Sequence, residues 1–240
     1  GNMTKKFPSE LRFNLVSKDW VVIATGRARR PETFRREQRV QHLENGKPCP
    51  FDNLRGQEYP TVAFFQGKQV ALPPSKTGVP AEWTTISIPN KYPAFSPNTS
   101  PKTRLIGPYH VMEGVGFHEV IITKHHTKDI PQFTEQQTKE LIDAYHARYL
   151  ALKDADFVNY IAIFKNKGPT AGATVAHPHS QLIATPITDP DIERSLQGSL
   201  EYFQQYAKCV HCQMLEWDRM EKKRIVYENE CFTAVCPFAS

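Results

Sequence analysis

One stretch in the second half of the chain places three polar side chains at alternating positions beside an apolar run. It extends from His177 to Ala184 with the sequence His-Pro-His-Ser-Gln-Leu-Ile-Ala. Residues two apart on a β-strand share a face, so His177, His179 and Gln181 are expected to project together. Burying three polar groups on one face of an apolar strand costs free energy unless they form hydrogen bonds or have a function. The stretch therefore predicts a strand that carries a functional face.

Other segments predict a chain of short strands with two helices. Thr134 and Gln137 form the pattern of a capping box, and Asp189-Pro190 places proline in the first turn of a second helix. Between Pro73 and Pro108 lie eight of the nineteen prolines, which predict an extended connection around one short strand. The apolar stripes expected on the two helices are Leu141, Ile142, Tyr145, Tyr149 and Leu152, and Ile192, Leu196, Leu200 and Phe203. The predicted strands cover residues 19–25, 83–88, 118–123, 157–164, 177–184, 224–227 and 232–235.

Composition argues against a globally disordered protein and against a membrane-spanning one. Hydrophobic residues make up 40% of the 240-residue chain and charged residues 23%, so a packed core is expected and global disorder is not. No run approaches the roughly 18 consecutive apolar residues of a membrane span. No apolar secretory segment follows the first residues either, so we expect a cytoplasmic protein without a membrane partner.

Basic residues are unevenly placed, although the net charge is only 30 − 25 = +5. Six arginines lie within thirteen residues: Arg27, Arg29, Arg30, Arg35, Arg36 and Arg39. Such a cluster fits a polyanion, a single phosphorylated small molecule, or solvent alone. Apart from Phe34 the cluster lacks interleaved aromatic residues, so a phosphate pocket is favoured over nucleic acid.

The loop before the histidines suits an anion. Gly168 and Gly172 allow backbone N–H groups to approach a phosphate, and Thr174 adds a hydroxyl donor. An imidazole beside such a loop suits nucleophilic attack on phosphorus, because neutral histidine exists at physiological pH. The alternative is a solvent-exposed histidine pair on an edge strand.

These features together resemble the galactose-1-phosphate uridylyltransferases, a branch of the histidine-triad superfamily. The resemblance spans nearly the whole chain. It is carried by Asn166-Lys-Gly168, His177-Pro-His-Ser-Gln181, Asp19-Trp-Val-Val-Ile23, Arg27-Ala-Arg-Arg-Pro31, Cys49-Pro-Phe51, Asn90-Lys-Tyr-Pro-Ala94, Gly116-Phe-His-Glu-Val-Ile121 and Pro237-Phe-Ala239. Ser180 departs from the family pattern, in which glycine is frequent at this place.

The resemblance implies an α+β fold with a histidine-triad-like, mainly antiparallel sheet and packed helices. Residues 1–206 are expected to form the N-terminal nucleotidyltransferase half, and residues 207–240 the start of a second half that stops early. The family also implies a homodimer acting on a nucleotide sugar and a sugar 1-phosphate. We expect no nucleic-acid partner, because a phosphate pocket fits the arginine cluster better.

The resemblance also implies roles for individual residues. His179 is the expected nucleophile, and Gln181 is expected to bind the phosphate of a nucleotidyl-histidine intermediate. Glutamine at this third position marks the transferase branch, whereas the hydrolases carry a third histidine. The residues expected to bind substrate are Arg27, Arg30, Asn90, Asn166, Gly172 and Thr174.

A structural zinc site is a further implication. The family pattern selects Cys49, Asp52, His126 and His177, with aspartate in place of a second cysteine. Zinc accepts a carboxylate oxygen, and four protein ligands leave no open position for water. His125 is the alternative to His126, and a metal-free loop is the alternative to the site. The Cys209-x-x-Cys212 pair has only Cys231 and Cys236 as further thiols after it.

The expected reaction is uridylyl transfer from UDP-glucose to a hexose 1-phosphate such as galactose 1-phosphate. Two alternatives remain open. The Gly-Phe-His-Glu-Val-Ile segment and the Ala-Gly-Ala-Thr loop also resemble an adenylyl-transferring branch that phosphorolyses ADP-sugars. A non-catalytic nucleotide-binding module is the second alternative, because sugar recognition in the family lies largely in the second half.

Overall fold

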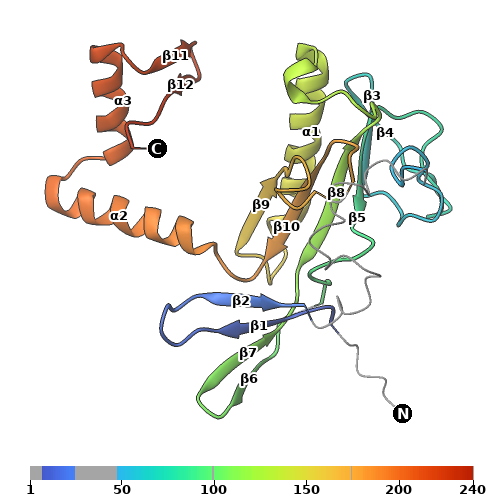
Figure 1. Ribbon diagram of the computed structural model, residues 1–240, viewed down its shortest axis with the longest axis horizontal. Helices are drawn as coiled ribbons and strands as arrows, with labels where there is room; N and C mark the ends of the chain where they lie inside the picture. Colours follow the sequence, from blue (N-terminus) through green and yellow to red (C-terminus); the bar gives the residue numbers. More distant parts are fainter. Residues whose placement is uncertain (1–6, 25–47, 99, 174, 240) are drawn as a thin grey trace. The chain divides into compact units, whose positions relative to one another are not determined.

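The computed structural model describes residues 7–24, 48–98, 100–173 and 175–239 (Figure 1). The chain divides into two compact units, Gly1–Ile187 and Thr188–Ser240, and each is described by itself. None of the described helices is long and apolar enough to cross a membrane.

The first unit contains two antiparallel sheets and one long helix. Its described elements are β1 (Glu10–Phe13), β2 (Trp20–Ile23), β3 (Val62–Phe65), β4 (Lys68–Val70), β5 (Thr85–Pro89), β6 (Thr103–Ile106), β7 (Tyr109–Glu113), β8 (Phe117–Thr123), the 3-10 turn η2 (Ile130–Gln132), α1 (Glu135–Leu152), β9 (Tyr160–Phe164) and β10 (His179–Thr185).

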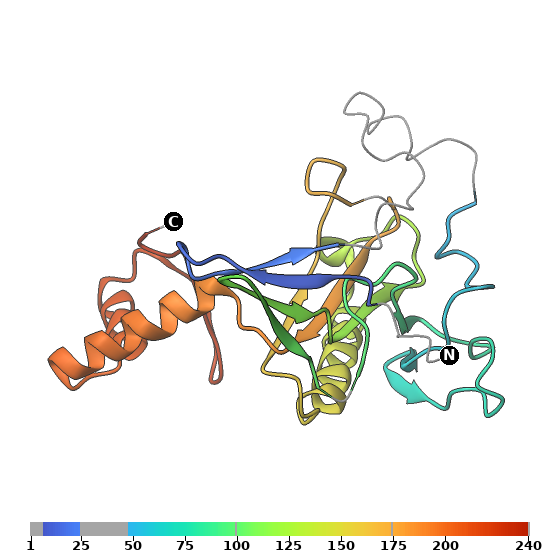
Figure 2. The same cartoon turned by 90° about the horizontal axis from the view of Figure 1, so that it is seen from below.

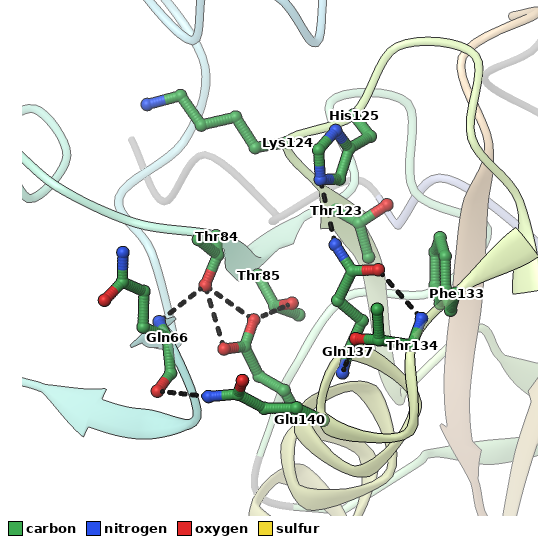
Figure 3. A pocket seen from close by; sticks show the side chains of 11 residues that line it. Gln66, Thr84, Thr85, Thr123, Lys124, His125, Phe133, Thr134, Gln137 and Glu140 are labelled. Carbon is green, nitrogen blue, oxygen red and sulfur yellow. Dashed lines mark hydrogen bonds between the residues drawn. The ribbon is translucent and has the colours of Figure 1, made fainter.

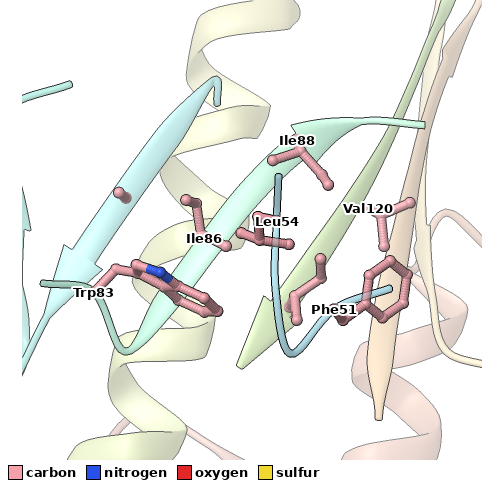
Figure 4. Close-up of a cluster of buried hydrophobic side chains, with 8 residues drawn as sticks. Phe51, Leu54, Trp83, Ile86, Ile88 and Val120 are labelled. Carbon is pink, nitrogen blue, oxygen red and sulfur yellow. The ribbon is translucent and has the colours of Figure 1, made fainter. Parts of the chain in front are cut away.

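The larger sheet has six strands in the order β4-β3-β5-β8-β10-β9, and all neighbouring pairs are antiparallel. Leu182 and Ala184 of β10 pack with Leu141 and Ala144 of α1 on one face. The opposite face carries a second buried cluster, which Figure 4 shows. This cluster consists of Phe51, Leu54, Ala63, Trp83, Ile86, Ile88, Val120 and Ile122. The sheet therefore has a helix-packed face and a face partly covered by the segment around Phe51.

The smaller sheet has the order β2-β1-β7-β6. In Figure 2 the blue β1–β2 pair and the green β6–β7 pair lie side by side. Gly114 follows β7 and donates its N–H to the carbonyl of Ser9 over 3.0 Å. A Cβ at this glycine would lie 2.5 Å from the Ser9 carbonyl oxygen, so only glycine permits this approach.

The second unit contains α2 (Pro190–Tyr206), α3 (Val210–Glu221), β11 (Ile225–Glu228) and β12 (Thr233–Val235). Asp189 caps α2 by accepting the N–H of Asp191, and Pro190 stands in its first turn as predicted. The Nε–H of Arg224 donates to the buried carboxylate of Asp218 on α3 over 2.8 Å. This ion pair joins α3 to the start of the β11–β12 hairpin.

The predicted fold class, α+β with a mainly antiparallel sheet and packed helices, is confirmed. The capping box of Thr134 and Gln137 is also confirmed at the start of α1. The predicted domain boundary between residues 206 and 207 stays a prediction. It separates the two halves expected of the family, whereas the two compact units are divided by contacts within the structure.

Three local expectations were wrong in detail, and one helix was missed. The strand that carries the polar residues begins at His179, so His177 lies before it. The proline-rich segment holds both β5 and β6, and α3 was not predicted. Ile142 and Tyr149 of α1 and the predicted stripe of α2 are largely exposed in the part of the chain that the structure describes. Helical periodicity identifies an apolar face but not what covers it.

A buried ion pair joins α1 to the sheet. Arg148 of α1 donates two hydrogen bonds to Glu119 of β8, over 2.8 and 2.7 Å. The same carboxylate accepts from the hydroxyls of Ser87 and Thr61 over 2.9 and 3.0 Å. The side chain of Glu119 is 4% exposed and that of Arg148 is 12% exposed, so neither charge is well solvated.

We therefore expect Arg148→Met to lower the free energy of unfolding by about 3–5 kcal/mol, because it leaves a buried carboxylate without its counter-charge. Lys139→Met on the same helix is the matched control. Lys139 forms an exposed pair with Asp143, and its loss is expected to change stability by about 0.3–0.5 kcal/mol. Urea titration measures both values; equal effects of the two substitutions contradict the prediction.

Candidate active site

A cavity of about 660 Å³ lies on the sheet face opposite α1. Its wall includes side chains from the end of β5, from β8 and β10, and from the loop between β9 and β10. His179, Gln181 and Ile183 line it, whereas Ser180 of the same strand contacts Tyr145 of α1. The alternation expected of the strand therefore holds from His179 onward and directs two of the three predicted polar residues into the cavity.

The imidazole of His179 is held by the backbone of His177. Its Nδ1 lies 2.8 Å from the His177 carbonyl oxygen, which can only accept. The proton of the neutral ring is therefore on Nδ1, and Nε2 carries the lone pair. Burial lowers the pKa of His179, an effect opposed by this backbone hydrogen bond. The ring of Phe51 packs edge-on against it at 5.1 Å between centroids. The arrangement suits a nucleophilic nitrogen.

Gln181 meets a histidine from the neighbouring strand. Its Oε1 lies 2.9 Å from Nε2 of His118 on β8, and both residues line the cavity. Sequence reasoning did not single out His118 as a site residue. A signal was present, because His118 shares its face of the strand with the apolar residues Val120 and Ile122.

Three of the predicted substrate-binding residues also line the cavity. Asn90 follows β5, Asn166 follows β9, and Gly172 lies in the loop before β10 with φ of +85°. The N–H of Gly172 donates to the carbonyl of Pro169 over 3.0 Å, so this loop already satisfies one of its own donors. Arg27, Arg30 and Thr174 lie outside the described residues.

The four predicted metal ligands come together. The ligand atoms of Cys49, Asp52, His126 and His177 all lie within 4.8 Å of one another. Oδ1 of Asp52 is 2.7 Å from Nδ1 of His126 and 3.1 Å from Nδ1 of His177. The Sγ of Cys49 is 3.7 Å from the same His177 nitrogen. This cluster of sulfur, oxygen and nitrogen donors can bind a metal ion.

The buried ring of His177 supports that interpretation. Its Nε2 lies 2.7 Å from the carbonyl oxygen of Thr123, so in the neutral ring the proton is on Nε2. The lone pair of Nδ1 then faces the carboxylate of Asp52 and the sulfur of Cys49, which are themselves electron donors. Metal-binding histidines typically donate their second N–H to a backbone carbonyl in this way. The hydrogen bond from His126 lowers the pKa of Asp52, which favours the ionised ligand.

The alternative ligand, His125, lies elsewhere. Its Nε2 is 3.0 Å from Nε2 of Gln137, and it lines a separate cavity of about 360 Å³ at the start of α1 (Figure 3). In that cavity the buried carboxylate of Glu140 accepts from Thr84 over 2.7 and 2.8 Å and from Thr85 over 2.5 Å. Glu140 thereby ties α1 to the sheet, and His126 is the histidine of the donor cluster.

The fold and the site define an antiparallel α+β protein with an unprotonated imidazole nitrogen and a carboxamide in one cavity, beside a four-residue donor cluster. The family model for the galactose-1-phosphate uridyl transferase N-terminal domain matches residues 2–189, and the chain belongs to this family.

Among curated relatives, the ADP-glucose phosphorylase of Arabidopsis thaliana is 30% identical over 246 residues, which cover 100% of this chain and 65% of the relative. The galactose-1-phosphate uridylyltransferase of Thermotoga maritima is 28% identical over 231 residues, covering 95% of this chain and 62% of the relative. The crystal structure of the Arabidopsis ADP-glucose phosphorylase with bound ADP-glucose matches with a TM-score of 0.62 and 28% identity, over 97% of this chain and 64% of that one. The chain thus spans less than two thirds of the length of these relatives.

Proposed function

We propose that this protein is a nucleotidyltransferase that acts on nucleoside diphosphate sugars through a nucleotidyl-His179 intermediate. The observation that carries the proposal is the hydrogen bond from Nδ1 of His179 to the His177 carbonyl, which leaves Nε2 unprotonated in the cavity. Family membership supports it, as do the names of the relatives, which are uridylyltransferases and an ADP-glucose phosphorylase.

The proposed reaction has two balanced steps. In the first, Nε2 of His179 attacks the α-phosphorus, an N–P bond forms, and the P–O bond to the sugar 1-phosphate breaks with its electron pair leaving on oxygen. In the second, a phosphate oxygen of the acceptor attacks the same phosphorus, and the electron pair of the N–P bond returns to Nε2. The proton stays bonded to Nδ1 throughout, and its hydrogen bond to the His177 carbonyl stabilises the positively charged ring of the intermediate.

Polar groups of the cavity are proposed to bind the phosphoryl oxygens. Gln181 supplies amide N–H donors beside His179, and Asn166 and Gly172 line the same cavity. The family resemblance assigns Arg27, Arg30 and Thr174 to the phosphates as well, and Asn90 to the nucleoside. Bidentate arginine donors suit the charge that develops at phosphorus.

The expected nucleotide sugar is UDP-glucose, with a hexose 1-phosphate such as galactose 1-phosphate as acceptor. A second candidate is adenylyl transfer from an ADP-sugar, with phosphate as acceptor. It is favoured by the match of the whole chain to a relative named ADP-glucose phosphorylase and by the solved relative that holds ADP-glucose. Both candidates use the same His179 chemistry and differ in the base and the acceptor.

We further propose zinc at Cys49, Asp52, His126 and His177, because this donor set fits zinc and closes its coordination shell. Its role is structural. Fixing His177 also fixes the carbonyl that binds Nδ1 of His179, so the donor cluster and the nucleophile are connected through one residue. A homodimer is proposed from the family resemblance, and a cytoplasmic location from the sequence-based expectation above.

His179→Ala is expected to abolish covalent labelling by a nucleotide sugar labelled at the α-phosphate, because the attacking nitrogen is lost. His146→Ala, an exposed position on α1, is the control and is expected to label as the wild type does. His177→Ala should mainly weaken metal binding and folding. Acid-labile label on the denatured protein is the measurement. Wild-type labelling of His179→Ala contradicts the assignment and makes His177 the candidate.

Base preference is tested by labelling the protein separately with UDP-glucose and ADP-glucose at equal concentrations. We expect stronger labelling from UDP-glucose. Equal or stronger labelling from ADP-glucose favours the hypothesis of adenylyl transfer from an ADP-sugar and leaves the proposed role of His179 unchanged. A folded protein that takes label from neither nucleotide contradicts the proposed function and favours the alternative of a non-catalytic binding module.

Elemental analysis of the reduced, purified protein is expected to give about one zinc per chain. Asp52→Ala and Cys49→Ala should each lower this content, because each removes one of the four ligands. Cys231→Ser is the control, since Cys231 is exposed and belongs to the second unit. A wild-type content far below one equivalent, or the same loss in all three variants, rules out this site.

A further inference from the structure

We propose that His118 is a positioning residue for Gln181. Its Nε2–H binds Oε1 of Gln181, which turns the two N–H donors of the carboxamide toward the reacting phosphate beside His179. This inference rests on the proposed function, because it assigns the contact to nucleotidyl transfer at His179. It adds a residue on another strand to the groups that act directly on the substrate.

The backbone decides which nitrogen of His118 carries the proton. The N–H of Ala94 points to Nδ1 of His118 over 3.0 Å, and a backbone N–H can only donate. Nδ1 is therefore the acceptor, and in the neutral ring the proton is on Nε2. Oε1 of Gln181, at 2.9 Å, is a suitable acceptor for that proton.

Asn90 does not compete for this proton. Its Oδ1 accepts the N–H of Tyr92 over 2.9 Å, which directs its Nδ2 toward His118. Nδ2 of Asn90 lies 3.2 Å from Nε2 of His118, and both nitrogens are donors in this tautomer. Of these two neighbours of Nε2, only the carboxamide oxygen of Gln181 can accept its proton.

The direction of the Gln181 amide follows. A carboxamide turned by 180° would oppose its NH₂ group to the Nε2–H of His118 and present its oxygen to an anionic phosphate. Both contacts are unfavourable. In the observed orientation, Nε2 of Gln181 has no hydrogen-bond partner among the described residues, and the side chain lines the cavity with His179. Its two donors are thus available for phosphoryl oxygens.

The strand pairing keeps His118 in place. The residue is 6% exposed, and its carbonyl accepts the N–H of Asn90 over 2.8 Å. β8 pairs with β10 so that His118 lies opposite Ile183 and Val120 opposite Gln181. A donor fixed in this way needs no reorganisation when charge develops at phosphorus, which is the source of its expected effect on the rate.

Two substitutions separate the two nitrogens of His118. In His118→Asn, the amide oxygen can occupy the place of Nδ1 and accept from Ala94, but the side chain is too short to reach Gln181. In His118→Gln, the longer side chain places an amide N–H near the position of Nε2 and restores the donor. Thermal unfolding of both variants shows whether each folds as the wild type does.

The readout is the single-turnover rate constant for labelling of His179 at saturating nucleotide sugar. We expect His118→Asn to lower it about tenfold with little change in the saturation constant, and His118→Gln to recover most of the loss. The loss should not exceed that of Gln181→Ala, for which one hydrogen bond to a charged group predicts about ten- to a hundredfold.

The decisive comparison uses Gln181→Ala as the background. If His118 acts through Gln181, His118→Asn should slow labelling less than twofold in this background. The same tenfold loss in both backgrounds overturns the proposal, as does a His118→Gln variant that folds normally but is as slow as His118→Asn.

A second measurement does not depend on activity. The ¹⁵N resonances of His118 should show a protonated Nε2 and an unprotonated Nδ1, and Gln181→Ala should shift the Nε2–H signal. A proton on Nδ1 overturns the proposal. Absence of any labelling in the wild type, with the tautomer as expected, contradicts the proposed function and shows that the His118–Gln181 contact has a different task.

Discussion

The antiparallel pairing of β8 with β10 is the interaction on which the site depends. Its register sets Gln181 opposite Val120 and Ile183 opposite His118, which brings two polar side chains from different strands to one face. A shift by one residue would turn each of them to the α1 side and expose Leu182 to the cavity. The burial of Leu182 and Ala184 against α1 therefore also determines where the polar groups point.

The polar side chains on the two faces of the sheet have different surroundings. On the α1 face, Glu119 and Glu140 are satisfied by hydroxyl and arginine donors that join helix and strands. On the other face, polar groups of His179 and Gln181 remain directed into the cavity. A backbone carbonyl accepts a hydrogen bond from each of the two histidines. The carbonyl of Thr123 accepts from Nε2 of His177, and the carbonyl of His177 accepts from Nδ1 of His179. Each carbonyl selects which ring nitrogen is left with a lone pair.

The sequence was sufficient for features that depend on neighbours along the chain. Local hydrogen bonds explain the capping by Thr134 and Gln137 and the proline at the start of α2. Side-chain spacing explains the alternation of residues from His179 onward. The family was also accessible, because the motifs that carry the resemblance are spread along nearly the whole chain. The role of His179 as nucleophile stays a prediction. The strand limits were less accurate, and His177 proved to lie before β10.

Tertiary structure decided what depends on residues far apart in the chain. Asp52 meets His126 and His177 across 74 and 125 positions, and only this meeting selects His126 over the adjacent His125. His118 reaches Gln181 across 63 positions, so no local pattern paired them. The apolar stripe of α2 had the correct period, yet it is largely exposed among the described residues. Periodicity along a chain fixes the direction of a side chain relative to its own element, whereas its partner is fixed by the packing of distant elements.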